Sequence, residues 1–220
     1  GEGGLRSAAQ YPVQVAVVHW DLGARREPRV ALETNIRPPV PIRAEATECH
    51  GLSDADVADA PPFEHVGEDI RRALSERLLV AYNLPFDWHV WDSSLRRLNP
   101  PVHAFAGFPF GGLDPLVWAR AVPSSGRTIG NTLRDVARRL CVPTSGLHHA
   151  SADALMTARI SIPLLRSLYE AGTRLDTVRD AWRATVLEAR AWEASAALYR
   201  SSRSSEAAFD TPWTDMKEAV

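Results

Sequence analysis

The stretch that decides the fold is Leu-Leu-Val-Ala-Tyr-Asn-Leu-Pro-Phe-Asp, residues 78–87. Its first five residues form a short apolar run, which is typical of a fully buried β-strand. Asn83 to Asp87 follow as a turn, and the pattern predicts a helix from about Asp87 to Leu98. Asp87 is therefore expected at a strand-to-helix junction, on the sheet edge where open α/β sheets bind ligands. The alternative is that Asp87 only caps the helix, a contribution of about 1 kcal/mol.

Upstream of this stretch the chain predicts two more strands. Residues 12–20 are an apolar, β-branched run, and residues 29–37 alternate as a second strand after a hairpin turn. Strands come first and then alternate with helices, which predicts an α/β fold with a mixed sheet flanked by helices. Leu113 and Asp114 are expected at the end of another strand. Helices are expected to begin at Ser53 and Pro115 and to cover about residues 63–77, 128–140 and 149–169.

The 220 residues are enough for one sizeable α/β domain with an appendage. We expect this domain to cover residues 1–170. A second helical stretch, 171–203, reads as an extension, and residues 204–220 read as a loose tail.

Composition excludes several classes of function. The formal net charge of −2 provides no global basic field, which weighs against a passive, non-specific coat on DNA. This net charge is compatible with an enzyme that neutralises phosphate locally with metal ions. No apolar run approaches the roughly 20 residues of a membrane span, and the first residues lack a signal segment, so we expect a cytoplasmic protein without a membrane partner. Cys49 and Cys141 lack metal-ligand spacing.

A second candidate site lies at the start of the helix expected at 149–169. The run His-His-Ala-Ser-Ala-Asp, residues 148–153, can place His148 in the loop and Asp153 in the first helical turn, at one mouth. An imidazole there can take a proton from water while the aspartate holds a metal ion. The alternative is that Asp153 only stabilises the helix N-terminus and His148 is a solvated loop residue. Glu2 by itself indicates no function.

Taken together, these runs resemble the DEDDh exonucleases, the proofreading-type 3′→5′ enzymes related to the polymerase III epsilon subunit. Residues 36–63, from Ile-Arg-Pro-Pro through His-Gly-Leu to Pro-Pro-Phe, are similar to the exit of a strand and the loop that follows it in that family. Residues 79–87 resemble the second motif, and residues 148–153 resemble the third, with its His-x4-Asp spacing. Residues 113–120 are similar to the junction between these motifs. The order agrees over about residues 2–168, which implies a ribonuclease-H-like fold.

The resemblance also implies a role for each matching residue. Glu2, Asp87 and Asp153 would be metal ligands, and His148 would be the general base. Carboxylates suit hard cations such as Mg²⁺ or Mn²⁺, and two such ions would clamp the phosphate at the 3′ end of single-stranded DNA or RNA. The candidate substrate contacts are His50, in a loop expected to approach the site, together with Asn83 and Phe86.

The sequence departs from the family in its first motif. The aspartate of the Asp-x-Glu pattern should lie two positions before Glu2, which is ahead of Gly1, together with most of a strand central to the sheet. Either the chain is a fragment or processed form, or the motif is lost. A lost motif favours the alternative function, a catalytically impaired module that binds nucleic-acid ends or a protein partner. Tyr82 stands where the family often has histidine, and we expect a structural role for it.

Overall fold

The computed structural model describes residues 11–22, 26–98, 112–122, 130–144 and 149–202, with backbone alone for 192–202. Strands β1 (Gln14–His19) and β2 (Arg29–Asn35) form an antiparallel pair with a bulge between Val17 and Val18. The two strands expected at the start of the chain are therefore confirmed, each within about two residues of its predicted bounds. The tail expected over 204–220 falls outside the described residues.

Two isolated parallel bridges lie outside this strand pair. Arg37 bridges Pro62, and Val80 bridges Leu113. The second bridge is closed by the Leu113 N–H donating to the Leu79 carbonyl at 2.9 Å and by the Ala81 N–H donating to the Leu113 carbonyl at 3.2 Å. The strand predicted over 78–82 is thus reduced to a single bridge, while Leu113 lies at a strand position as expected.

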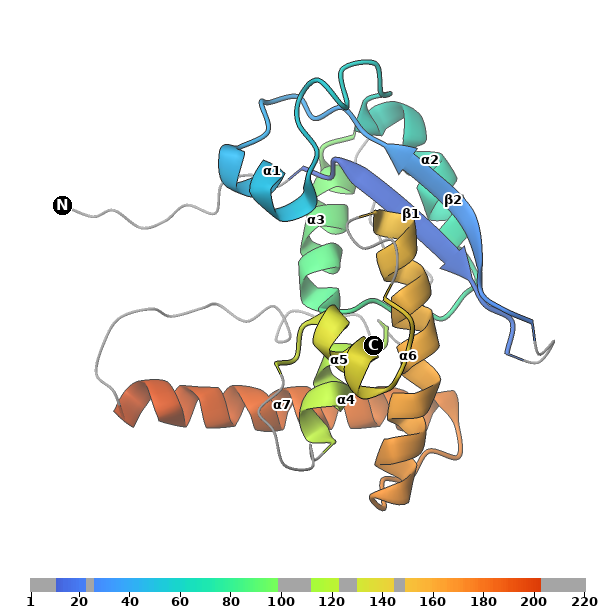
Figure 1. Ribbon diagram of the computed structural model, residues 1–220, viewed down its shortest axis with the longest axis vertical. Helices are drawn as coiled ribbons and strands as arrows, with labels where there is room; N and C mark the ends of the chain where they lie inside the picture. Colours follow the sequence, from blue (N-terminus) through green and yellow to red (C-terminus); the bar gives the residue numbers. More distant parts are fainter. Residues whose placement is uncertain (1–10, 23–25, 99–111, 123–129, 145–148, 203–220) are drawn as a thin grey trace.

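Helices make up most of the described chain (Figure 1). They are α1 (Ala44–His50), α2 (Phe63–Leu74), α3 (Leu84–Arg96), α4 (Pro115–Ala121), α5 (Leu133–Arg139), α6 (Ala150–Glu170) and α7 (Val178–Ser202). The helices expected at 63–77, from Pro115, at 128–140 and at 149–169 correspond to α2, α4, α5 and α6. Helix α3 begins three residues earlier than predicted, and α7 begins only at Val178, inside the stretch 171–203 that was expected to be helical.

Helix α1 corrects the prediction for the connection between Arg43 and Pro62. The Ser53 N–H donates to the Asp56 carboxylate at 2.7 Å, as a capping residue would, but the chain continues as turns rather than as a helix. The helix lies upstream instead, and Gly51 ends it with a φ of 78°. No residue of α1 is buried, so it lacks the apolar periodicity that identifies a helix from sequence.

The two faces of the β1–β2 pair are covered by different helices. Val17 points toward α2 and α3, where it belongs to a cluster with Ile70 and Trp91, and Phe63 meets Trp91 edge-on at 5.5 Å between ring centres. Side chains alternate along a strand, so Gln14 points to the opposite face, toward the start of α6. The sheet therefore lies between two helical layers, as an α/β fold requires.

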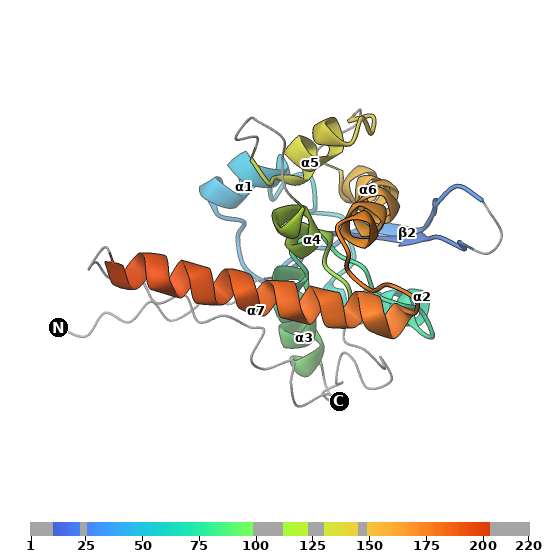
Figure 2. The ribbon, with the colours of Figure 1, turned by 90° about the horizontal axis from the view of Figure 1, so that it is seen from below.

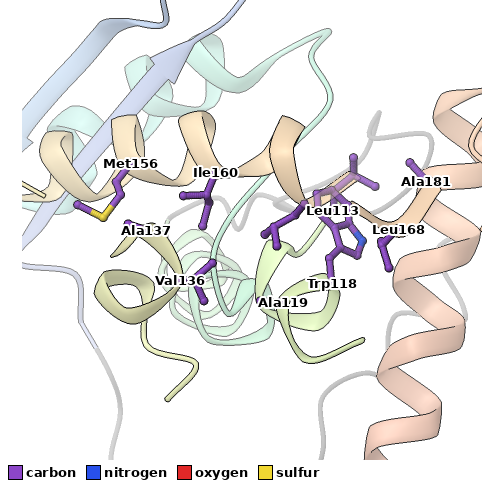
Figure 3. Packing of buried hydrophobic residues seen from close by; sticks show 10 residues of the cluster. Leu113, Trp118, Ala119, Val136, Ala137, Met156, Ile160, Leu168 and Ala181 are labelled. Carbon is purple, nitrogen blue, oxygen red and sulfur yellow. The ribbon is translucent and has the colours of Figure 1, made fainter. Parts of the chain in front are cut away.

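A second core joins α6 to the helices that follow the sheet. Figure 3 shows Met156 and Ile160 of α6 above Val136 and Ala137 of α5, with Trp118 of α4 alongside. The Trp118 indole N–H donates to the buried Thr185 hydroxyl of α7 at 2.9 Å. Helix α7 runs across α4 (Figure 2), so this part of the expected extension packs on the core. Among the described residues, no helix is long and apolar enough to cross a membrane.

Candidate active site

The turn before Asp87 has an uncommon backbone conformation. Asn83 adopts a left-handed conformation, with φ 65° and ψ 47°, and it occupies the position that precedes α3. Asparagine tolerates this region better than most residues, which explains its place between the Val80 bridge and the helix. Because Asn83 holds the cap position, Asp87 lies inside the first turn and is not the capping residue that the alternative interpretation required.

The carboxylate of Asp114 holds this turn in place. Asp114 is 1% exposed, and its Oδ1 accepts hydrogen bonds from the backbone N–H groups of Asn83 at 3.0 Å and Leu116 at 2.9 Å. Its Oδ2 accepts from the N–H of Leu84 at 3.1 Å. Asp114 therefore caps α4, and the same side chain also satisfies the N-terminus of α3.

Asp87 is a carboxyl group in a cleft. The residue is exposed to solvent where it lines the cavity, and partial desolvation of its carboxyl together with the nearby Asp114 charge raises its pKa to about 7. Burial likewise raises the pKa of Asp114 to about 6, against the lowering effect of its backbone hydrogen bonds. A bound cation would oppose this shift and favour the ionised carboxylate of Asp87.

Asp153 is brought to the same region by a link between β1 and α6. The Ala150 N–H, at the helix start, donates to the side-chain carbonyl of Gln14 at 2.9 Å. Asp153 follows in the first turn of α6, where its N–H donates to the His149 carbonyl at 3.1 Å. The residue is half-buried. Gln14 was not predicted as a site residue, although a polar residue at the start of an apolar strand is a signal for such a contact.

One large cavity joins the candidate residues. Asp87, Asp153, His50 and Phe86 all line it, and its volume is about 2100 Å³. Asn83 is exposed on the adjoining turn.

The expected catalytic set, which comprises the metal ligands Glu2, Asp87 and Asp153 and the general base His148, is described only in part. Glu2 and His148 lie outside the described residues, and over the described ranges no three acidic, histidine or cysteine residues group closely enough to hold an ion. Asp87 and Asp153 are thus the two members of the expected set that the structure describes. Both offer carboxylate oxygens, which suit a hard divalent cation.

Comparison with known proteins identifies the family. The model of an exonuclease family, RNase_T, matches residues 4–161, which is well over half of the chain. The chain belongs to this exonuclease family. The resemblance to the DEDDh exonucleases, stated above from the motifs around Asp87 and Asp153, is confirmed.

Individual relatives of this exonuclease domain support the same family assignment. It is 31% identical over 162 residues to a DNA polymerase III subunit epsilon-like protein of Rhodobacter capsulatus, covering 73% of the chain and 22% of that protein. It is 28% identical over 131 residues to the DNA polymerase III subunit epsilon of Rickettsia typhi, covering 59% and 56%. The chain thus spans between about a fifth and just over half of the length of these relatives.

A solved structure shows the fold of the exonuclease domain. An exonuclease X, in complex with 5′ overhanging duplex DNA, superimposes with a TM-score of 0.54 at 21% identity, over 81% of this chain and 93% of that one. The fold is the ribonuclease-H-like α/β arrangement expected from the sequence.

Tyr82 has a structural role within this exonuclease domain. Its hydroxyl donates to the Asn131 carbonyl at 2.7 Å and so ties the strand segment to the approach of α5. Burial, together with the Asp114 charge, raises the pKa of the phenol, which stays protonated near neutral pH. These contacts agree with the structural role expected for Tyr82.

Proposed function

We propose that the chain is a metal-dependent 3′→5′ exonuclease that releases nucleotides from single-stranded ends of DNA or RNA. The observation that carries the proposal is that Asp87 and Asp153 line the same cavity although 66 positions separate them. Local capping would require no such convergence. The exonuclease family match, over residues 4–161, supports hydrolysis of phosphodiester bonds.

Asp87 and Asp153, together with Glu2, would hold Mg²⁺ or Mn²⁺ through carboxylate oxygens. Two such ions, when bound, supply charge stabilisation for a phosphate and its leaving oxygen. His148 would act as the general base that takes the proton of the attacking water, because its ordinary pKa of about 6.5 leaves the ring neutral at physiological pH. The raised pKa of Asp87 means that the free site is only partly ionised near pH 7.

The substrate would be a nucleic-acid end in the same cavity. Phe86 neighbours Asp87 and is 54% exposed, which leaves its ring free for a base to stack on. His50 lines the cavity with its Nδ1 accepting from the Leu52 N–H at 3.1 Å, and Asn83 adjoins it. That the structurally similar exonuclease X forms a complex with 5′ overhanging duplex DNA supports a nucleic-acid end as the ligand.

Cleavage of an end-labelled single strand tests the proposal. A 5′-labelled oligonucleotide should shorten stepwise in Mg²⁺ or Mn²⁺, and EDTA should stop the reaction. His148→Ala should slow cleavage about 100-fold or more, the usual contribution of a general base. His149→Ala is the matched control, because that exposed neighbour makes no side-chain capping bond. Binding of the strand without cleavage would instead favour the catalytically impaired module.

A further inference from the structure

The first residue of α6 is capped by a side chain that comes from the sheet. The first N–H groups of an α-helix have no partner inside the helix, and the side chain of the preceding residue usually accepts from one of them. His149 precedes α6 and makes no such bond. The N–H of Ala150 donates instead to Oε1 of Gln14, in β1, at 2.9 Å. A residue 136 positions away thus supplies the acceptor that the local sequence lacks.

Asn35 of β2 fixes the orientation of the Gln14 amide. The two residues are paired across the β1–β2 ladder, and Nε2 of Gln14 donates to Oδ1 of Asn35 at 3.0 Å. A backbone N–H can only donate, so the group of Gln14 that faces Ala150 must be its carbonyl oxygen. The amide nitrogen then faces Asn35, which offers it an acceptor. The Gln14 side chain is therefore held at both ends in one orientation.

This chain of hydrogen bonds ends at the turn that carries Asp153. The N–H of Asp153 donates to the His149 carbonyl at 3.1 Å, which closes the first turn of α6. Ala150, the residue that Gln14 holds, lies inside the same turn. The position of the Asp153 backbone therefore depends on where β1 places Gln14.

Packing alone does not fix α6 along its own axis. The helix packs against β1 (Figure 1). Apolar contact is non-directional, whereas a hydrogen bond weakens steeply away from its preferred length and angle. The bond between Ala150 and Gln14 consequently sets the register of the helix on the strand.

We propose that Gln14, oriented by Asn35, is a positioning residue for the candidate active site, because it holds the turn that presents Asp153 to the cavity that Asp87 also lines. The inference rests on the proposed function, in which Asp153 is a metal ligand. Residues that hold a metal ligand in place typically change metal affinity by about 10- to 100-fold when they are replaced. Gln14 also lines the cavity, and its neutral amide holds the helix without adding to the negative charge of the two aspartates.

Hydrogen exchange in the metal-free chain tests the positioning without reference to nuclease activity. Gln14→Met keeps the length of the side chain but removes its amide, so the Ala150 N–H should exchange faster by about tenfold or more. Asn35→Ala should act in the same direction, because the Gln14 amide loses the acceptor that orients it. Gln14→Glu retains an acceptor oxygen and should preserve the protection of Ala150.

Ile160→Val is the matched control for lost stability. Ile160 is fully buried on the same helix, about two turns after Asp153. Loss of its methyl group should lower the melting temperature by a few degrees, as loss of a capping bond does. The Ala150 exchange rate and the carboxyl ¹³C resonance of Asp153 should stay as in the parent, whereas Gln14→Met should change both.

Mn²⁺ affinity, measured by calorimetry, connects this positioning to the metal site. Gln14→Met should weaken binding about tenfold, and Ile160→Val should stay within about twofold of the parent. The inference is overturned if Gln14→Met exchanges Ala150 at the parent's rate, if it binds Mn²⁺ as tightly as the parent, or if Ile160→Val matches its effects. A parent that binds no Mn²⁺ contradicts the proposed function instead, and the metal-free exchange rates and Asp153 resonance still decide whether Gln14 positions Asp153.

Discussion

The Asp114 carboxylate accepts a hydrogen bond from the backbone N–H of Asn83 at 3.0 Å, across 31 positions of sequence. This bond fixes the left-handed turn that carries the chain from the Val80 bridge into α3. The orientation of Asp87 in the first turn of α3 therefore depends on a buried carboxylate that belongs to the next strand segment.

Replacement of Asp114 should destabilise the fold strongly. Asp114→Ala leaves three backbone N–H groups without their acceptor, and each unsatisfied buried group costs about 1–3 kcal/mol. We expect a loss of about 3 kcal/mol or more in the free energy of unfolding, measured by urea titration. Asp114→Asn keeps one acceptor oxygen and should lose less. An alanine variant within 1 kcal/mol of the parent would contradict this role.

The stability of the metal-free chain should depend on pH through Asp87 and Asp114. Both pKa values are raised in the folded state, to about 7 and about 6, from the ordinary value of 3.8. Between about pH 4 and 7 the folded chain thus binds more protons than the unfolded chain. The free energy of unfolding should fall as pH rises through this range and then level off.

Thermal melts in EDTA from pH 4 to 8 measure this dependence. Asp87→Asn should remove the part of the slope near pH 7, because the amide does not ionise. Asp92→Asn is the matched control on the same helix, where Asp92 pairs with exposed Arg96 at the surface. An identical slope in all three chains would show that Asp87 ionises as an ordinary surface acid.

Helix α7 should depend on its hydrogen bond to the core. Thr185→Val removes the acceptor of the Trp118 indole N–H, which is buried, at a cost of about 1–3 kcal/mol. Limited proteolysis should then cut within α7 sooner than in the parent. Thr185→Ser keeps the hydroxyl and should behave like the parent, and equal proteolysis of the valine and serine variants would argue against the bond.

Local pattern predicted much of this fold. The strand at Gln14–His19 and helices α4 and α6 follow from apolar periodicity together with capping residues, as at Asp114. Helix α1 was missed because it buries no residue. The predicted strand at 78–82 is reduced to one bridge, because among the described residues only Val80 of this segment pairs, with Leu113, and local pattern does not reveal which segments pair.

The sequence predicted the acidic residues of the candidate site but not the hydrogen bonds that position them. Asp87 and Asp153 were identified through motif spacing, and they line one cavity. The hydrogen bonds that Asn83 donates to Asp114 and that Ala150 donates to Gln14 join residues 31 and 136 positions apart. No local pattern carries contacts of that length, since they depend on how the strands and helices pack.

The central claim is that Asp87 and Asp153 hold shared cations. A double-mutant cycle, in which the affinity for Mn²⁺ is measured for each variant, tests it most directly. Affinity is measured by calorimetry for the parent, Asp87→Asn, Asp153→Asn and the double variant, with Asp92→Asn as control. Each single variant should weaken binding at least tenfold, and the double variant should be little weaker than either, because residues sharing an ion are not additive. Single losses that add fully, or parent-like affinity in either single variant, would contradict the claim.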